Sequence, residues 1–171
     1  MKILGIDPGL EGALTLINTV TRTLHVRAMP TWKRVTDSTS KTLIDEDAVT
    51  SIVAGWQPDE AWAEDVWSSE QMGVVSSFSF GEGKGILKGV LAASGLRREQ
   101  RFWVASATWK GQLRISADKP IAKKQAHLLF PDCKKLLSSA DKAESALIAL
   151  YGLLTNHPAL VKTSFPLRPG A

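Results

Sequence analysis

The chain has 171 residues, of which 44% are hydrophobic and 22% charged, a composition that excludes a disordered protein and fits one globular domain with a buried core. Its single cysteine, Cys133, excludes an internal disulfide and a cysteine-ligated zinc site, and no stretch approaches the roughly 20 apolar residues of a membrane span. The net charge of +4 is uneven, because residues 1–96 hold 8 Lys/Arg and 12 Asp/Glu whereas residues 97–171 hold 13 and 5, so the second part indicates either a polyanionic partner or a solvated basic face.

Three strands are predicted at the start of the chain. Residues 2–6 (KILGI) and 13–17 (ALTLI) flank the turn-forming DPGLEG stretch and therefore predict a hairpin, and residues 23–29 predict a third strand. The polar segment 29–41 contains Pro30 and has no clear period, so it predicts a loop.

The rest of the chain mixes helices and two more strands. Acids alternate with apolar residues over about 60–67, which predicts a strand with Glu64 near its end, and RFWVAS predicts a strand at 101–106. From residue 69 to 95 the pattern is helical but broken at FSFGEGKG. The other predicted helical segments are 45–55, 86–96, 107–113, 117–131 and 139–155. This order of elements predicts an α/β domain.

The last predicted helix carries carboxylates on its apolar side. At about 100° per residue, Glu144 falls within the apolar arc of the helix and Asp141 falls at its edge. The arc itself consists of Leu147, Leu150, Tyr151 and Leu154. A buried carboxylate without a partner costs several kcal/mol, so a positive group should face Glu144. Asp141 is equally well explained as an acid in a first helical turn capped by Ser138.

Three separate elements thus end in acids: Asp7, Glu64 and the pair Asp141 and Glu144. Gathered on one edge of a sheet, these oxygens would form a site that suits Mg²⁺ or Mn²⁺. Because like charges repel at short range, such a cluster is favourable only with cations bound.

Six stretches resemble, in order and spacing, the RuvC family of Holliday junction resolvases. They are GIDPGLEGAL, AEDVW, SSFSFGEGKGILKGVLAASG, VASATWK, AKKQAHLLFP and ADKAESALIALYG. The resemblance is greatest to the phage and organellar branches, in which a Phe-Gly-x-Gly-x-Gly stretch opens the second helix. It spans residues 1–155 as one nuclease domain and leaves 156–171 as a C-terminal tail.

The resemblance implies an RNase H-like α/β fold, with a central mixed five-stranded sheet flanked by helices. It also implies a homodimer that resolves four-way DNA junctions by symmetric, Mg²⁺-dependent phosphodiester hydrolysis, with two ions per site, Mn²⁺ as a substitute and no small-molecule cofactor. Other branched DNA stays open as a substrate. The first residues lack the long apolar segment and cleavage site of a secretory signal, so we expect a cytoplasmic protein of a bacterium or a phage-infected cell.

The resemblance also assigns roles to residues. Asp7 matches the catalytic aspartate of the first strand, Glu64 the glutamate that ends the fourth strand, and Asp141 and Glu144 the acid pair of the last helix, where Glu144 replaces the more common aspartate. Basic residues near the scissile phosphate are matched by Lys110 and Lys123, and Lys124 is an alternative to Lys123.

Further DNA contacts are expected outside the acid cluster, although surface lysines are more often simply solvated. Besides the active-site lysines, the expected contacts are Trp32, Lys33, Arg34, Phe78, Phe80, Lys84 and Lys88. GEGKG lacks the spacing of a nucleotide P-loop, so it predicts either a helix-entry loop that meets the DNA backbone or a structural tight turn. Gly85 and Gly89 share one helix face, which would let a second backbone approach.

Two other functions are compatible with parts of the pattern. Actin-like and sugar-kinase ATPases also begin with an apolar strand, an aspartate and a glycine turn, but their two-domain architecture needs a far longer chain. A junction-binding protein that does not cut would keep the fold and lose an acid, whereas all four carboxylate positions are filled here.

Overall fold

The structure is a computed structural model that describes residues 1–37, 39–67 and 72–170. Its centre is a six-stranded sheet in the order β7-β6-β1-β2-β3-β8, and a separate two-stranded sheet is formed by β4 and β5. The strands are β1 (Lys2–Asp7), β2 (Ala13–Asn18), β3 (Thr23–Ala28), β4 (Thr31–Val35), β5 (Ser40–Ile44), β6 (Glu60–Glu64), β7 (Arg101–Val104) and β8 (Arg168–Pro169).

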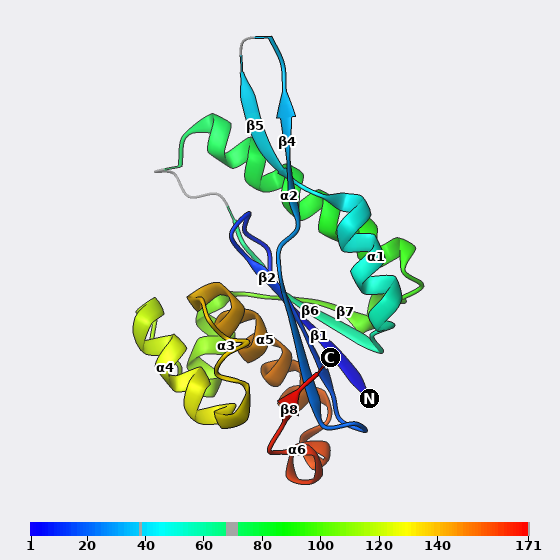
Figure 1. Cartoon of the computed structure of the whole chain (residues 1–171), viewed down its shortest axis with the longest axis vertical. Coiled ribbons are helices and arrows are strands. Elements are labelled where there is room, and N and C mark those ends of the chain that lie inside the picture. The colour runs from blue at the N-terminus through cyan, green and yellow to red at the C-terminus, as the bar shows by residue number, and fades with distance from the viewer. Residues whose placement is uncertain (38, 68–71, 171) are drawn as a thin grey trace.

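Helices cover both faces of the large sheet (Figure 1). They are α1 (Glu46–Trp56), α2 (Val74–Ala93), α3 (Ser106–Leu113), α4 (Lys119–Leu129), α5 (Ala140–Asn156) and α6 (Pro158–Ser164), with short 3₁₀ turns at Arg98–Gln100 and Pro131–Cys133. Helices α1 and α2 pack on one face, and α3 to α6 pack on the other. No helix in the described part of the chain is both long and apolar enough to cross a bilayer.

The sheet is mixed, as expected. Strands β1, β2 and β3 form an antiparallel meander, whereas β6 and β7 run parallel to β1. The carboxyl ends of β1 and β6 therefore lie at the same edge of the sheet, and side chains that alternate along each strand reach opposite helical layers. In β1, Leu4 and Ile6 belong to the core beneath α1 and α2, while Ile3 belongs to the core beneath α5.

Gly5 brings α5 unusually close to β1. A Cβ atom at Gly5 would overlap the carbonyl oxygen of Ser145 and lie 2.5 Å from the amide nitrogen of Ala149, so only glycine permits this packing. Next to this contact, the hydroxyl groups of Ser145 and Thr15 form a buried 2.6 Å hydrogen bond. Together these contacts determine how far α5 extends along β1.

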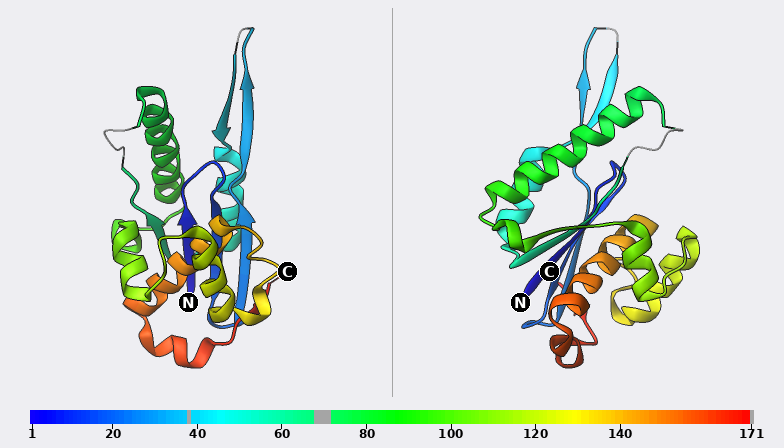
Figure 2. Two further views of the ribbon diagram at one scale, coloured as in Figure 1. Left: turned by 90° about the vertical axis from the view of Figure 1, so that its left-hand side faces the viewer. Right: turned by 180° about the vertical axis from the view of Figure 1, so that it is seen from behind.

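Several predictions of local structure were wrong. Segment 29–41, predicted as a loop, forms most of the β4–β5 hairpin, which extends beyond the large sheet on the same side of the molecule as the start of α2 (Figure 2). FSFGEGKG does not break the helix, because α2 runs through it without interruption; the predicted start of that helical segment at residue 69 lies outside the described residues. The sheet has six strands and not five, because residues 168–169 of the predicted tail pair with β3.

Helix α6 was not predicted, because it lies in the expected tail, but the remaining strands and long helices were placed correctly. The β1–β2 hairpin, the third strand, the strands ending near Glu64 and Val104, and the helices that begin after Asp45, Asp118 and Ser139 agree with the predicted segments to within a few residues. The cap of α5 is Ser139, not Ser138, and its hydroxyl accepts from the amide of Lys142.

We expect Gly5→Ala to lower the free energy of unfolding by about 3 kcal/mol or more, since the added methyl group must push the backbones of β1 and α5 apart. Gly55→Ala is the matched control. Gly55 lies in α1 with nothing within 4 Å of its Cβ position, so alanine there should be neutral or stabilise by about 0.5–1 kcal/mol. Urea denaturation followed by circular dichroism measures both changes, and an equal effect of the two substitutions would contradict the packing role of Gly5.

Candidate active site

Three carboxylates meet where β1 ends and α5 begins. Asp7, Asp141 and Glu144 each offer a carboxylate oxygen within 4.8 Å of the other two. Asp7 lies on the same face of β1 as Gly5, and Asp141 and Glu144 occupy the first turns of the helix that Gly5 admits. The close β1–α5 contact therefore brings residues more than 130 positions apart in sequence into one cluster.

Glu64 contributes a fourth carboxylate beside this group. It ends β6, the parallel neighbour of β1, on the face that carries Trp62 toward α5. Its carboxylate accepts a 3.1 Å hydrogen bond from the indole Nε1 of Trp109, a fully buried residue of α3. This bond orients Glu64 and leaves its other oxygen available to a further ligand.

Two lysines balance part of the negative charge. The Nζ of Lys110 on α3 lies 2.7 Å from Glu144, whose side chain is only 6% exposed, so the expected positive partner of Glu144 is present. At the start of α4, the Nζ of Lys119 lies 2.8 Å from Asp141. Four carboxylates with two lysines retain net negative charge, which is the electrostatic condition for binding a divalent cation.

The electrostatic strain is greatest at Asp7. Burial raises its pKa from 3.8 to about 7, and the neighbouring carboxylates of Glu144, Asp141 and Glu64 add to the rise. Burial likewise raises the pKa of Glu64, against the hydrogen bond from Trp109. The residues present thus fit a hard divalent cation: clustered carboxylate oxygens are the donors that Mg²⁺ and Mn²⁺ prefer, and such an ion would relieve the repulsion.

Of the lysines on α4, Lys119 and not Lys123 forms an ion pair with an acid of the cluster. The ammonium group of Lys123 donates to the backbone carbonyl of Ser138, just before α5, and Lys124 is exposed on α4. Lys119 was missed because it lies at the extreme start of α4, where the helical pattern marks only a boundary. Its proximity to Asp141 depends on how α4 packs against α5. The one sequence feature that could have pointed to Lys119 was its position directly after Asp118, the residue that caps α4.

The predicted contacts on the hairpin and on the first half of α2 lie on the other side of the sheet from α3 to α6. Trp32, Lys33 and Arg34 are all exposed on β4, and Trp32 is 42% exposed. Phe78 is 72% exposed on α2, with the ammonium group of Lys41 5.7 Å from its ring centre, whereas Phe80 is half-buried and lines an apolar cavity with Leu10, Ile44 and Gly83.

Lys84 does not lie in a loop, so both interpretations of GEGKG as a loop were wrong. Within α2, its Nζ lies 2.5 Å from Asp65, the residue after β6, and 4.3 Å from the ring centre of Trp67. This ion pair ties α2 to the strand that carries Glu64. The next exposed cation along the helix is Lys88, whose Nζ lies 5.2 Å from the ring centre of Trp103 on β7.

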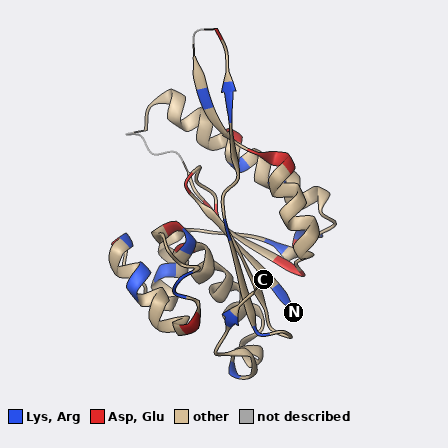
Figure 3. Ribbon diagram, in the orientation of Figure 1, with Lys and Arg blue, Asp and Glu red and all other residues tan. Residues whose placement is uncertain are grey.

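Positive charge flanks the acidic cluster on two sides. Figure 3 shows Lys and Arg gathered over α3 and α4 and along the hairpin. The arrangement combines a recessed group of carboxylates with cationic surroundings, and this combination can bring a polyanion to bound cations.

Comparisons with known proteins relate the chain to one fold. No protein-family model matches the sequence, and no curated protein sequence matches it. Among the solved structures that are similar to it are two of RuvC from Thermus thermophilus, each matched over 99% of this chain and all of its own length. RuvC of T. thermophilus has 14% identity and a TM-score of 0.56, and T. thermophilus RuvC in complex with a Holliday junction substrate has 13% identity and a TM-score of 0.53. The chain therefore has the RNase H-like α/β fold of RuvC.

The raised pKa of Asp7 predicts a pH-dependent stability in the absence of divalent cations. The unfolded chain releases the Asp7 proton near pH 4 and the folded chain only near pH 7, so the free energy of unfolding contributed by this group falls as the pH rises through that window. As the pH rises from 5 to 8, we expect the free energy of unfolding of Asp7→Asn to increase by a few kcal/mol relative to that of the unsubstituted protein. The reason is that one pKa unit corresponds to about 1.4 kcal/mol.

Urea denaturation in EDTA at several pH values measures this difference. Asp37→Asn, on an exposed residue, should leave the pH profile unchanged. Addition of Mg²⁺ at pH 8 should stabilise the unsubstituted protein and not Asp7→Asn. Parallel pH profiles for Asp7→Asn and the unsubstituted protein would contradict the assigned shift.

Proposed function

We propose that the protein is a metal-dependent endonuclease that resolves four-way DNA junctions. The observation that carries the proposal is the convergence of Asp7, Asp141 and Glu144 within 4.8 Å, with lysine ammonium groups in contact with two of them, on a RuvC-like fold. One of the similar structures holds RuvC in complex with a Holliday junction substrate, which supports branched DNA as the substrate class. The sequence stretches that resemble the phage and organellar branches of the RuvC family support placing the protein with those branches.

The proposed metal ligands are Asp7, Glu64, Asp141 and Glu144. When bound there, Mg²⁺ ions, two per site and replaceable by Mn²⁺, would supply an activated water and charge stabilisation at the phosphate. Asp7 and Glu64 come from neighbouring strands and so present their carboxylates from a rigid sheet, while Trp109 holds Glu64 in place. Rigid placement of this kind is what phosphoryl transfer requires, because its catalysis depends on positioning and electrostatics.

Lysines at the rim would act on the phosphate itself. Lys110 and Lys119 hold their ammonium groups against Glu144 and Asp141, and from there each can stabilise the negative charge that grows on the phosphate in the transition state. Lys123 and Lys124 would contact DNA farther out along α4. On the other side of the sheet, DNA contacts are assigned to Trp32, Lys33, Arg34, Phe78, Phe80, Lys84 and Lys88.

Symmetric cutting of a four-way junction needs two active sites, and we assign a homodimer in which α2 forms the contact. Gly85 and Gly89 have nothing within 4 Å of their Cβ positions, so a second helix can approach there closely. Val74 and Val75, each at least 80% exposed, add apolar area on the same helix.

The cleavage assay is the direct test. A synthetic four-way junction should be cut with Mg²⁺ and remain intact with EDTA, whereas linear duplex DNA should be cut at least a hundredfold more slowly. Glu64→Gln should bind the junction with unchanged affinity and lose at least a hundredfold in single-turnover rate, since a neutral amide is a poor cation ligand. The matched control is Glu46→Gln on α1, which should cut normally. Full activity in Glu64→Gln would exclude the metal site, and binding without cutting by the unsubstituted protein would indicate a junction-binding protein.

The dimer is tested by sedimentation. We expect the unsubstituted protein to sediment as a dimer at micromolar concentration and Gly85→Arg/Gly89→Arg to sediment as a monomer with unchanged helical content, because two bulky charges would block the close approach of helices. A monomeric unsubstituted protein that still cuts both strands symmetrically would refute the assignment.

A further inference from the structure

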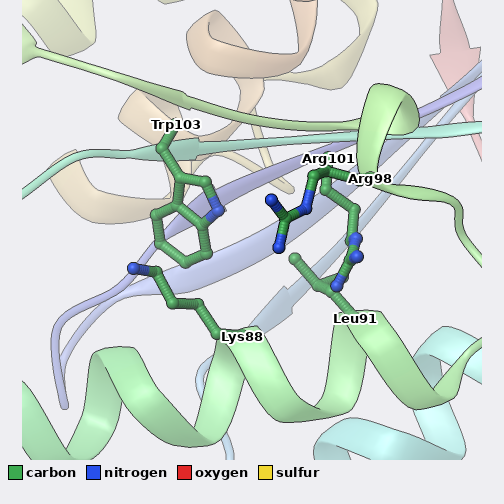
Figure 4. A pocket seen from close by; sticks show the side chains of 5 residues that line it. All are labelled: Lys88, Leu91, Arg98, Arg101 and Trp103. Atoms are coloured by element: carbon green, nitrogen blue, oxygen red, sulfur yellow. The ribbon is translucent and has the colours of Figure 1, made fainter.

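A cationic cavity of about 300 Å³ lies between α2 and the edge strand β7, away from the acidic cluster. Lys88 and Leu91 project from α2 on one side, and Trp103 and Arg101 project from β7 on the other, with Arg98 contributed by the 3₁₀ turn before the strand (Figure 4). Leu91, which is almost fully buried, adds apolar surface to the lining. We call this the β7 pocket.

None of the cations of the β7 pocket forms an ion pair within the described residues. Six ion pairs are formed in that part of the chain, and none of them involves Lys88, Arg98 or Arg101. The one hydrogen bond of the Arg101 guanidinium within that part goes from Nε to the backbone carbonyl of Arg97, at 3.3 Å, which orients the group without cancelling its charge. Three like charges around one small cavity repel each other, and an anion in the cavity would remove that repulsion.

Trp103 gives the pocket a second binding feature. Its indole is half-buried beside the three cations, and the ammonium groups of Lys88 and Lys84 lie 5.2 Å and 5.8 Å from its ring centre. A flat aromatic surface next to several cations is the combination that binds nucleic acid strands, in which phosphate meets Arg or Lys and a base or sugar packs on the ring.

β7, which lines the pocket, pairs with β6, the strand that ends in Glu64. Trp103 is adjacent to Val104, which pairs with Glu64 across the two parallel strands. Near the end of β6, the ammonium group of Lys84 lies 4.3 Å from the ring centre of Trp67 and 5.8 Å from that of Trp103, and Lys88 follows one helical turn later. This row of alternating cations and indoles leads from the neighbourhood of Glu64 to Arg98 and Arg101.

We propose that the β7 pocket binds the phosphodiester backbone of a DNA strand outside the active site, with the adjoining base or sugar packed on Trp103. The inference rests on the proposed function, since the strand is an arm of the junction that reaches the acidic cluster. It adds Arg98, Arg101 and Trp103 to the interface, none of which was marked by the sequence patterns. The alternative occupant with the same chemistry is a free phosphate or nucleotide.

The test compares Arg98→Gln/Arg101→Gln with the control Lys162→Gln/Arg168→Gln, which removes the same charge from exposed positions on α6 and β8. Junction affinity is measured by fluorescence anisotropy at several salt concentrations in EDTA. The association constant K falls as salt rises, and each lost phosphate contact should make the slope of log K against log salt shallower by about 0.9. The slope for the pocket variant should therefore be shallower by about 1 to 2, and its junction affinity should be about tenfold or more lower. The control should change by much less.

Single-turnover cleavage at saturating protein separates this pocket from the active site. The rate of the pocket variant should match that of the control, because the pocket touches no reacting group. Trp103→Leu, with folding verified by thermal denaturation, should weaken binding several-fold without changing the salt slope. Equal junction affinity and equal salt slope for the pocket variant and the control would overturn the proposal. It would also be overturned if the pocket variant lost binding to inorganic phosphate or a mononucleotide while its DNA binding stayed unchanged. Because affinity is measured without cleavage, the test remains decisive if the protein binds junctions without cutting them.

Discussion

The backbone-to-backbone contact of β1 and α5 is the constraint on which the site depends. Without a side chain at Gly5, the helix lies directly on the strand, and the first turns of the helix reach the end of the strand where Asp7 stands. A larger residue would move α5 outward and separate Asp141 and Glu144 from Asp7. The buried hydrogen bond between Ser145 and Thr15 adds a second restraint, which also limits sliding of the helix along the sheet. Core packing and site geometry are therefore consequences of the same contact.

The carboxylates of the acidic cluster repel each other, and the fold holds them together despite that repulsion. Burial and neighbouring charges raise the pKa of Asp7 to about 7, so ionising this group in the folded chain without a cation is unfavourable. The ion pairs of Lys110 and Lys119 offset only part of that repulsion. Such residual strain is typical of sites whose function requires a bound charge, since the binding of the cation then recovers free energy that folding alone leaves unfavourable.

The two faces of the sheet serve different purposes in the proposed function. On the α5 face, carboxylates and two lysines form a compact reaction site at the ends of β1 and β6. On the α2 face, the hairpin, the exposed aromatic side chains and the β7 pocket offer cations and flat rings over a wider area. Lys84 connects the two, because its ion pair with Asp65 joins α2 to the segment that follows Glu64. A large, branched polyanion can be held on such a surface while one phosphate reaches the acids.

The sequence by itself determined the α/β class, the strand ends that carry Asp7 and Glu64, and the need of Glu144 for a positive partner, because alternation and helical period are local properties of the chain. It failed at β4, whose residues are all exposed and so have no buried face to impose a period, and at the glycines of α2, where helical packing overrides weak propensity. Only the tertiary structure decided that Lys119 rather than Lys123 meets Asp141, and that Arg98, Arg101 and Trp103 share a cavity with Lys88. Those contacts depend on how separate elements pack against one another. The periodicity of a sequence describes each helix or strand alone and does not give the distance between the faces of two of them.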